Sequence, residues 1–260
     1  MEKLFSIKGK SALITGGSSG IGLMIARGFV EAGATVYISS RKAKVCQEVA
    51  DELSKIGRCF AFPADMNSAD DRKALVEEIS QREGKLSILI NNAGANWGAP
   101  IEEYSDEAFA KVMSLNVNAV FSLTRDLLPL LENAGSAEEP ARVINIGSMD
   151  GIHVPVVQET GTFGYSASKA AVHHLTKTLA VELGPRNITV NAIAPGFFPS
   201  KMTAWVLEQY GENIKAACPL NRIGKPDELI GIAIYLASKA GAYTNGTVTP
   251  IDGGTHLSKK

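Results

Sequence analysis

The feature that most constrains the fold of this chain is a glycine-rich segment, Thr15 to Gly22, which directly follows a short apolar run and leads into a helical pattern. Glycine has no side chain, so the backbone there can approach a ligand closely. The N–H groups at the start of a helix attract negative charge. An apolar strand, a glycine loop and a helix in this order indicate a pyrophosphate site, although such a loop can also be a plain connection between two elements.

Short β-branched, apolar runs alternate with longer helical patterns along the whole chain. This order predicts an α/β fold of the Rossmann-like, doubly wound type, with a parallel sheet covered by helices on both faces. We expect seven strands, near Ser11–Thr15, Thr35–Ser39, Cys59–Phe62, Leu86–Asn91, Arg142–Gly147, Thr189–Ala194 and Val248–Ile251. We expect helices over Ile21–Ala32, Lys44–Lys55, Ala69–Glu83, Asp106–Glu132, Tyr165–Leu183 and Asp227–Ala237. No Pro- or Ser-rich linker divides the series, so residues 1–260 are predicted to form one domain.

Composition and charge argue against several classes of function. The formal net charge is −1 with Lys and Arg scattered, which disfavours nucleic acid and membrane surfaces as partners. Cys46, Cys59 and Cys218 are too far apart for a metal or redox motif, and we expect reduced, mostly buried thiols. His173 and His174 are adjacent and cannot form the i, i+4 pair of a metal site, so no metal is expected. The chain lacks an apolar signal or membrane-spanning run, which predicts a cytoplasmic protein.

The end of the second predicted strand indicates which dinucleotide is bound. Rossmann-type sites for NAD carry an acid there, which hydrogen-bonds the ribose 2′-hydroxyl and repels a 2′-phosphate. This chain instead has Ser39, Ser40, Arg41 and Lys42. A guanidinium flanked by hydroxyls suits a phosphate, which predicts NADP(H). The alternative is that both cations are solvated charges at a strand end.

Further motifs follow the glycine loop in a fixed order. They are Asn91-Asn92-Ala93-Gly94, Asn116, Ser148, Tyr165-x-x-x-Lys169 and Pro195-Gly196. Together with the spacing Thr-Gly-x-x-x-Gly-x-Gly, they resemble the short-chain dehydrogenase/reductase family over the whole chain. The resemblance implies an NADP(H)-dependent oxidoreductase acting on carbonyl and hydroxyl groups. It implies cofactor contacts from Gly16, Ser18, Ser19, Gly20, Ile21, Gly22, Arg41, Asp65, Met66, Asn92, Ala93, Gly94, Tyr165, Lys169, Pro195, Gly196 and Phe198.

The sequence supports Asp65 and Asn92 as cofactor contacts to different degrees. Asp65 follows the third predicted strand, where the family places a carboxylate against the adenine, but it could equally cap the helix that begins near Ser68. In the turn after the fourth strand, Asn92 is the favoured neighbour of the cofactor.

Carbonyl reduction needs a proton donor for the oxygen that becomes negative and a group that holds this oxygen. The free pKa of tyrosine, about 10, is too high for ready proton exchange at neutral pH. Lys169 lies one helical turn after Tyr165, where an ammonium group would favour the phenolate. The resemblance implies that Ser148 binds the carbonyl, Tyr165 donates the proton, Lys169 lowers the Tyr165 pKa, and Asn116 anchors a water relay behind Lys169.

The pattern Tyr-x-x-x-Lys occurs a second time, at Tyr235 and Lys239, where it ends a predicted helix just before Gly241. A lysine there complements the helix dipole, so we interpret Tyr235 as structural. The spacing from Ser148 to Tyr165 exceeds the usual spacing of the family. We expect the additional residues to enlarge a wall of the substrate pocket.

Candidate pocket residues are mostly apolar, which favours an acyl, aromatic or alicyclic carbonyl over a free sugar. An alternative is that residues 197–205 form a lid whose aromatic side chains pack on the body of the protein. Residues 91–99 and 194–203 resemble rhamnolipid-pathway 3-oxoacyl reductases, which implies a 3-oxoacyl thioester, although no basic patch for an acidic carrier protein is evident. A CoA ester, a small ketone, a diketone and a steroid-like alcohol are the alternative substrates. The pocket candidates are Trp97, Val154, Phe197, Phe198, Met202 and Trp205.

Apolar residues lie on more than one face of the helix predicted from Tyr165 to Leu183. This pattern predicts packing against another subunit, and the family resemblance implies a homodimer or homotetramer. Two other classes of function are a catalytically silent NADP(H)-binding regulator, against which the full set of site residues argues, and a structural scaffold. A scaffold would leave the glycine loop and the order Ser148, Tyr165, Lys169 unexplained.

Overall fold

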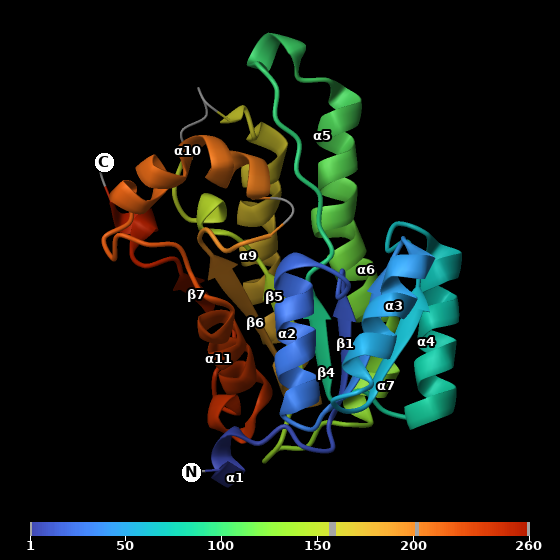
Figure 1. The fold of residues 1–260 in the computed structure, drawn as a ribbon. Coiled ribbons are helices and arrows are strands. Elements are labelled where there is room, and N and C mark those ends of the chain that lie inside the picture. The colour runs from blue at the N-terminus through green and yellow to red at the C-terminus, as the bar shows by residue number, and fades with distance from the viewer. Residues whose placement is uncertain (1, 156–159, 201–202, 259–260) are drawn as a thin grey trace.

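The computed structural model describes residues 2–155, 160–200 and 203–258, and a seven-stranded parallel sheet lies at its centre (Figure 1). The strand order is β3-β2-β1-β4-β5-β6-β7. This arrangement confirms the predicted doubly wound α/β fold. The strands are β1 Ser11–Thr15, β2 Thr35–Ser40, β3 Cys59–Pro63, β4 Ile88–Asn91, β5 Ala141–Ile146, β6 Ile188–Pro195 and β7 Val248–Ile251.

Helices cover both faces of the sheet (Figure 1). One apolar core lies between the sheet and α2 Gly20–Glu31, α3 Ala43–Leu53 and α11 Pro226–Ala237. A second core lies between the opposite face and α4 Ala69–Glu83, α6 Ala119–Asp126, α7 Leu128–Glu132 and α9 Phe163–Leu183. Successive strand residues point to opposite faces, so Ile14 joins the first core and Leu13 the second. Burial on both faces explains why the strands are nearly continuous apolar runs.

The predicted helix Asp106–Glu132 is wrong as a single element. The chain forms α5 Asp106–Met113, a π-helical turn η2 Ser114–Asn118, then α6 and α7. Pro129 stands in the first turn of α7, where its missing N–H is tolerated, whereas in the interior of a continuous helix it would remove a hydrogen bond. The π turn replaces the i→i+4 hydrogen bonds of an α-helix with i→i+5 bonds over a few residues, and no residue type marks that change in the sequence.

Helix α10, Ala204–Ala217, was not expected from the sequence. None of its described residues is fully buried, so it lacks the apolar face that identifies a core helix. The other helical elements within the described residues are short: α1 Glu2–Phe5, η1 Ile101–Glu103, η3 Met149–Gly151, η4 Gly184–Arg186, η5 Lys239–Gly241 and η6 Thr255–Leu257.

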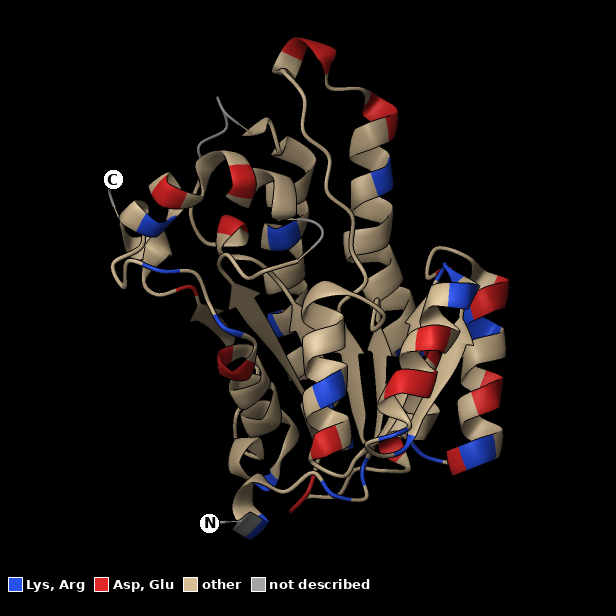
Figure 2. Ribbon diagram, viewed as in Figure 1, with Lys and Arg blue, Asp and Glu red and all other residues tan. Residues whose placement is uncertain are grey.

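The surface charges of the helices are mixed. Figure 2 shows Lys and Arg interspersed with Asp and Glu over the face in view. The three cysteines are buried and free, as expected. Among the described residues, no cluster of His, Cys, Asp and Glu could hold a metal ion. Within the same part of the chain, no helix is long and apolar enough to cross a membrane.

Candidate active site

The glycine loop lies where the strand order reverses, between β1 and β4. Ligands of open α/β sheets bind at such a switch point, beyond the carboxyl ends of the strands. The Asn92 Nδ2 group donates hydrogen bonds to the carbonyls of Thr15 at 2.8 Å and Gly16 at 3.3 Å. A Cβ atom on Gly16 would lie 2.8 Å from this nitrogen, and one on Gly22 would lie 2.4 Å from it. Asn92 therefore braces the loop, and this close packing requires glycine at both positions.

The first turn of α2 is free to bind an anion. Ser19 is the N-cap residue of this helix, but its side chain makes no capping hydrogen bond, and the first turn contains no acidic residue. Gly16 and Gly20 have φ angles of 66° and 53°, a region that other residues rarely adopt. These features fit a pyrophosphate held by backbone N–H groups at the helix start.

The end of β2 lies beside this loop, because the Ser39 carbonyl accepts the N–H of Gly16 at 2.7 Å. The Ser39 Oγ atom is buried without a hydrogen-bond partner among the described residues. Arg41 follows directly and is exposed, and no described residue forms an ion pair with it. A free guanidinium and an unused hydroxyl next to the glycine loop fit a 2′-phosphate.

The segment between β3 and α4 contains the residue that caps the start of α4. The N-cap of α4 is Ser68, whose Oγ accepts the N–H of Asp71 at 3.1 Å. The Asp65 carboxylate instead accepts the N–H of Asn67 at 3.0 Å. The alternative that Asp65 caps this helix is therefore wrong, and its contact with the adenine stays a prediction. Met66 is buried, and its carbonyl accepts a hydrogen bond from Arg72.

The structure brings Ser148, Tyr165 and Lys169 together. Ser148 follows β5, while Tyr165 and Lys169 lie on α9. A hydrogen bond joins the side chains of Ser148 and Tyr165. The Lys169 Nζ atom lies 5.4 Å from the centre of the Tyr165 ring and donates a hydrogen bond to the Ile146 carbonyl at 2.7 Å. A hydroxyl, a phenol and an ammonium group therefore share one site at the carboxyl end of the sheet.

The pKa values of this pair differ from the expectation. Burial and, to a smaller extent, the Asp150 charge raise the pKa of Tyr165 to about 12, against the opposing effect of the Ser148 hydrogen bond. Burial also lowers the pKa of Lys169 to about 8, and the Asp150 charge opposes that. The net shift of the Tyr165 pKa is upward because desolvation of the phenolate dominates, and the lowering of this pKa by Lys169 stays a prediction. At neutral pH the phenol is protonated, which is the form that can donate a proton.

Asn116 lies in the π turn and connects two parts of the site. Its Nδ2 donates to the Ala95 carbonyl and to Ser168 Oγ, both at 2.9 Å, and its Oδ1 accepts the Ala95 N–H at 2.8 Å. The side chain therefore ties the segment after β4 to the catalytic helix. A water relay from Asn116 to Lys169 stays a prediction.

Two residues of the site were missed by sequence reasoning. Asp150 donates its N–H to Ser148 Oγ at 3.1 Å, and its carbonyl accepts a hydrogen bond from Ser166 Oγ at 2.8 Å. Burial raises the pKa of the Asp150 carboxyl, against the opposing charges of His153 and Lys169. His173 lies one turn after Lys169, and its Nε2 accepts the Ser148 N–H at 3.4 Å. The sequence gives only one indication of each: Asp150 lies two residues after Ser148, and His173 lies four residues after Lys169.

The predicted pocket residues divide into two groups. Trp97, Val154 and Trp205 are 54%, 82% and 62% exposed. Phe197 and Phe198 line a separate cavity, described below, and Phe198 is only 2% exposed. The Phe198 ring belongs to the apolar core, so its side chain is not available to a cofactor. Met202 lies outside the described residues.

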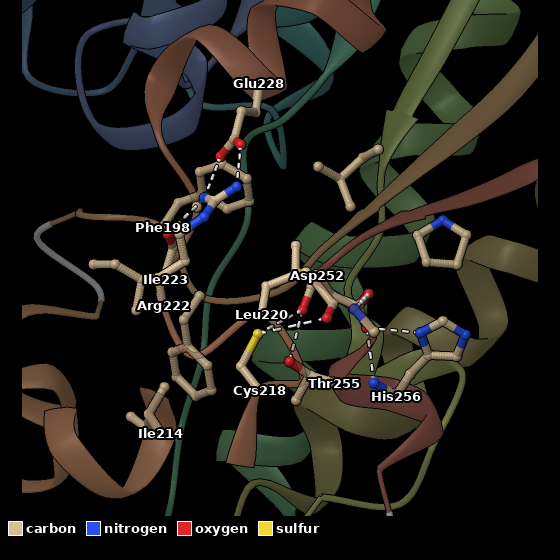
Figure 3. Close-up of a pocket in the computed structure, with 16 residues that line it drawn as sticks. Phe198, Ile214, Cys218, Leu220, Arg222, Ile223, Glu228, Asp252, Thr255 and His256 are labelled. Atoms are coloured by element: carbon tan, nitrogen blue, oxygen red, sulfur yellow. Dashed lines mark hydrogen bonds and ion pairs between the residues drawn. The ribbon is translucent and has the colours of Figure 1, made fainter. Parts of the chain in front are cut away.

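A cavity of about 530 Å³ lies between β7, the end of α10 and the segment before α11 (Figure 3). Its charged side chains are paired with each other. Arg222 forms a fork with Glu228, and His256 Nδ1 lies 2.7 Å from Asp252 (Figure 3). Ser148, Tyr165 and Lys169 do not line this cavity, so it is not the candidate site of reduction.

The Pro195-Gly196 motif ends β6 beside this cavity. A Cβ atom on Gly196 would lie 2.7 Å from the Asp252 Cβ, so the chains pack closely there. Tyr235, the residue of the second Tyr-x-x-x-Lys pattern, lies on α11, and its hydroxyl lies 2.7 Å from the Thr244 hydroxyl. This contact supports a structural interpretation of Tyr235.

The fold and the site define a Rossmann-type oxidoreductase, with a dinucleotide loop at the switch point and a Ser, Tyr and Lys group at the same edge of the sheet. The family model for short chain dehydrogenases matches residues 10–211. The chain belongs to the short-chain dehydrogenase/reductase family, whose members act on CH–OH and C=O groups. This result confirms the predicted family and enzyme class, and the comparisons give no support to a silent regulator.

Two similar proteins and one solved structure illustrate the family. The chain is 49% identical over 259 residues to a rhamnolipids biosynthesis 3-oxoacyl-[acyl-carrier-protein] reductase of Pseudomonas aeruginosa, covering 99% of this chain and 100% of that protein. It is 32% identical over 250 residues to a 3alpha-hydroxysteroid dehydrogenase of Mediterraneibacter gnavus, covering 95% and 97%. A solved structure described as the Pseudomonas aeruginosa RhlG/NADP active-site complex superposes with a TM-score of 0.94 at 48% identity, covering 99% and 100%.

Proposed function

We propose that this chain is an NADPH-dependent reductase that converts a 3-oxoacyl thioester or a related ketone into the 3-hydroxy product. The observation that carries the proposal is the position of Tyr165. Its phenol is hydrogen-bonded to Ser148, and the Lys169 Nζ atom lies 5.4 Å from the centre of its ring. This is the arrangement that carbonyl reduction requires, namely a positioned proton donor beside a group that can hold the carbonyl oxygen.

In the proposed reaction, the Ser148 hydroxyl donates a hydrogen bond to the carbonyl oxygen of the substrate and holds it near the Tyr165 hydroxyl. NADPH, when bound, supplies the hydride. Tyr165 donates its proton to the oxygen as negative charge develops there. Lys169 then stabilises the phenolate that remains, because its ammonium group lies over the ring. Asn116 keeps the segment after β4 in contact with the catalytic helix.

The choice of NADP(H) rests on Arg41 and Ser39. The guanidinium of Arg41 has no ion-pair partner among the described residues, the Ser39 hydroxyl is an orphan buried group, and β2 has no acid at its end. The similar RhlG structure of Pseudomonas aeruginosa is described as an NADP complex, which agrees with this choice. Gly16, Gly20, Gly22 and Asn92 are the residues we propose around the pyrophosphate.

The choice of substrate rests on the exposed aromatic residues and on the relatives. Trp97 and Trp205 offer apolar contact area, which fits an acyl chain. The similar Pseudomonas protein is described as a 3-oxoacyl-[acyl-carrier-protein] reductase. A second candidate is a steroid-like or other small apolar ketone, since a similar protein is a 3alpha-hydroxysteroid dehydrogenase. A homodimer or homotetramer in the cytoplasm completes the proposal.

Oxidation of NADPH, followed at 340 nm with purified protein, tests this proposal. The substrates are acetoacetyl-CoA, 3-oxoacyl carrier proteins, diketones, quinones and 3-ketosteroids. We expect turnover with a 3-oxoacyl thioester or another apolar ketone, and a strong preference for NADPH over NADH. No NADPH oxidation with any member of the panel would contradict the proposed function.

A further inference from the structure

The ring of His173 lies directly behind the turn that carries Ser148. His173 is on α9, one turn after Lys169, and is only 6% exposed. Its Nε2 atom accepts the backbone N–H of Ser148 at 3.4 Å. The ring also hydrogen-bonds the backbone of Gly151 at the other end of the turn. One side chain thus contacts both ends of the segment from Ser148 to Gly151.

Two glycines make room for this ring. A Cβ atom on Gly147 would lie 2.1 Å from His173 Nε2, and one on Gly151 would lie 2.8 Å from His173 Cε1. Neither distance is compatible with van der Waals packing, so any larger residue would displace the imidazole. Positions 147, 151 and 173 therefore form one packed unit around Ser148.

This contact requires the neutral imidazole, because only that form has one ring nitrogen that accepts and one that donates. Burial, helped by the charges of Lys169 and Lys177, lowers the pKa of His173 to about 4, against the opposing effect of the Gly151 backbone. The ring is therefore neutral at physiological pH. Protonation would replace the acceptor at Nε2 with a donor facing another donor, the Ser148 N–H.

We propose that His173 is a positioning residue for Ser148, which it holds through the backbone in the orientation that binds the substrate carbonyl. The inference rests on the proposed function of Ser148. On its other side, Ser148 Oγ accepts the N–H of Asp150 at 3.1 Å. With its backbone and its oxygen both fixed, the Ser148 hydroxyl has little freedom before substrate arrives, and such preorganisation favours the transition state.

The test compares His173→Leu and His173→Gln with the matched control His174→Leu, which alters the adjacent, exposed residue. We expect His173→Leu to lower kcat for acetoacetyl-CoA roughly 10- to 50-fold, because a buried N–H loses its acceptor. The Kd for NADPH should stay within about twofold, since His173 is not part of the cofactor loop. The amide oxygen of His173→Gln can accept from Ser148, so this variant should recover most of the lost kcat. His174→Leu should match the wild type.

A second readout needs no turnover. The ¹⁵N chemical shifts of the imidazoles in the full-length protein report the tautomer and pKa of each histidine. We expect His173 to stay neutral, with an accepting Nε2, at pH values down to about 5, because burial holds its pKa well below that of a free histidine.

Three results would overturn the proposal: His173→Leu retaining kcat within about twofold, His173→Gln failing to exceed the kcat of His173→Leu, or the His173 ring titrating at the ordinary pKa of a free histidine, about 6.5. Failure of the proposed function gives a different pattern. In that case the wild type would oxidise no NADPH with acetoacetyl-CoA, while the ¹⁵N shifts would still show whether His173 accepts the Ser148 N–H.

Discussion

The Nζ atom of Lys169 donates a hydrogen bond to the carbonyl of Ile146 at 2.7 Å. Ile146 is the last residue of β5, and Ser148 follows two residues later. The lysine is only 6% exposed and therefore ties the catalytic helix α9 to the strand that presents the carbonyl-binding hydroxyl. In the proposed reaction this one ammonium group both fixes the geometry and stabilises the Tyr165 phenolate.

Lys169→Met tests this double role, because it removes the charge and the hydrogen bond but keeps a side chain of similar length. We expect kcat to fall by roughly two to four orders of magnitude, as for loss of a group that supports general acid catalysis. Circular dichroism should confirm that the variant is folded. A variant that retains more than about a tenth of the wild-type kcat would contradict the assigned role.

Arg41→Ala tests the cofactor assignment. Removing a charge-assisted contact with the 2′-phosphate should raise the KM for NADPH by roughly 10- to 100-fold. The KM for NADH should change by less than about threefold, because NADH has no 2′-phosphate. Initial rates with both cofactors give the ratio, and Lys44→Ala, an exposed cation on the following helix, is the control. An unchanged ratio of the two KM values would refute NADP(H) as the cofactor this site selects.

Asp150→Asn tests the electrostatics of the pair. The Asp150 charge raises the pKa of both Tyr165 and Lys169, so its removal should lower both. Reduction requires the protonated phenol and the Lys169 ammonium group, and the ammonium is lost first, as the pH rises through the Lys169 pKa of about 8. We therefore expect the alkaline limb of kcat/KM against pH to move to lower pH in the variant. A limb that stays in place, or moves to higher pH, would show that Asp150 does not act on the Lys169 ammonium group.

The same substitution has an effect on stability that can be measured without substrate. Burial raises the pKa of the Asp150 carboxyl, so its ionised form destabilises the fold as the pH rises through that pKa. The neutral amide of Asp150→Asn removes this cost. We expect the variant to gain free energy of unfolding at neutral pH and to show no gain well below the pKa of the free carboxyl. Urea unfolding at several pH values measures the difference.

The strands and the glycine loop could be predicted because their signals are local. A run such as residues 11–15 must be apolar to be buried on both faces, and the glycines at 16 and 22 leave no room for a side chain beside Asn92. The π turn at Ser114–Asn118 and helix α10 escaped prediction for the opposite reason. The first differs from an α-helix in a backbone hydrogen-bond pattern that no residue type marks, and the second has no fully buried side chain.

The sequence predicted which residues form the candidate site but not the direction of their pKa shifts. The order of Ser148, Tyr165 and Lys169 is visible in the sequence, whereas the direction of the Tyr165 pKa shift depends on how deeply the fold buries the phenol. The contact between His173 and Ser148 joins residues 25 positions apart, and it exists only because β5 and α9 pack together. The burial of Phe198 could not be predicted for the same reason, because its ring packs against Gly224, which is distant in the sequence.

Tyr165→Phe is the most direct test of the central claim that this phenol donates the proton. The variant keeps the ring and removes only the hydroxyl, so we expect NADPH to bind with a Kd within about threefold of the wild-type value. We expect kcat to fall by roughly three or more orders of magnitude, because the proton donor is lost. A variant that binds NADPH normally and turns over acetoacetyl-CoA at near the wild-type rate would contradict the mechanism.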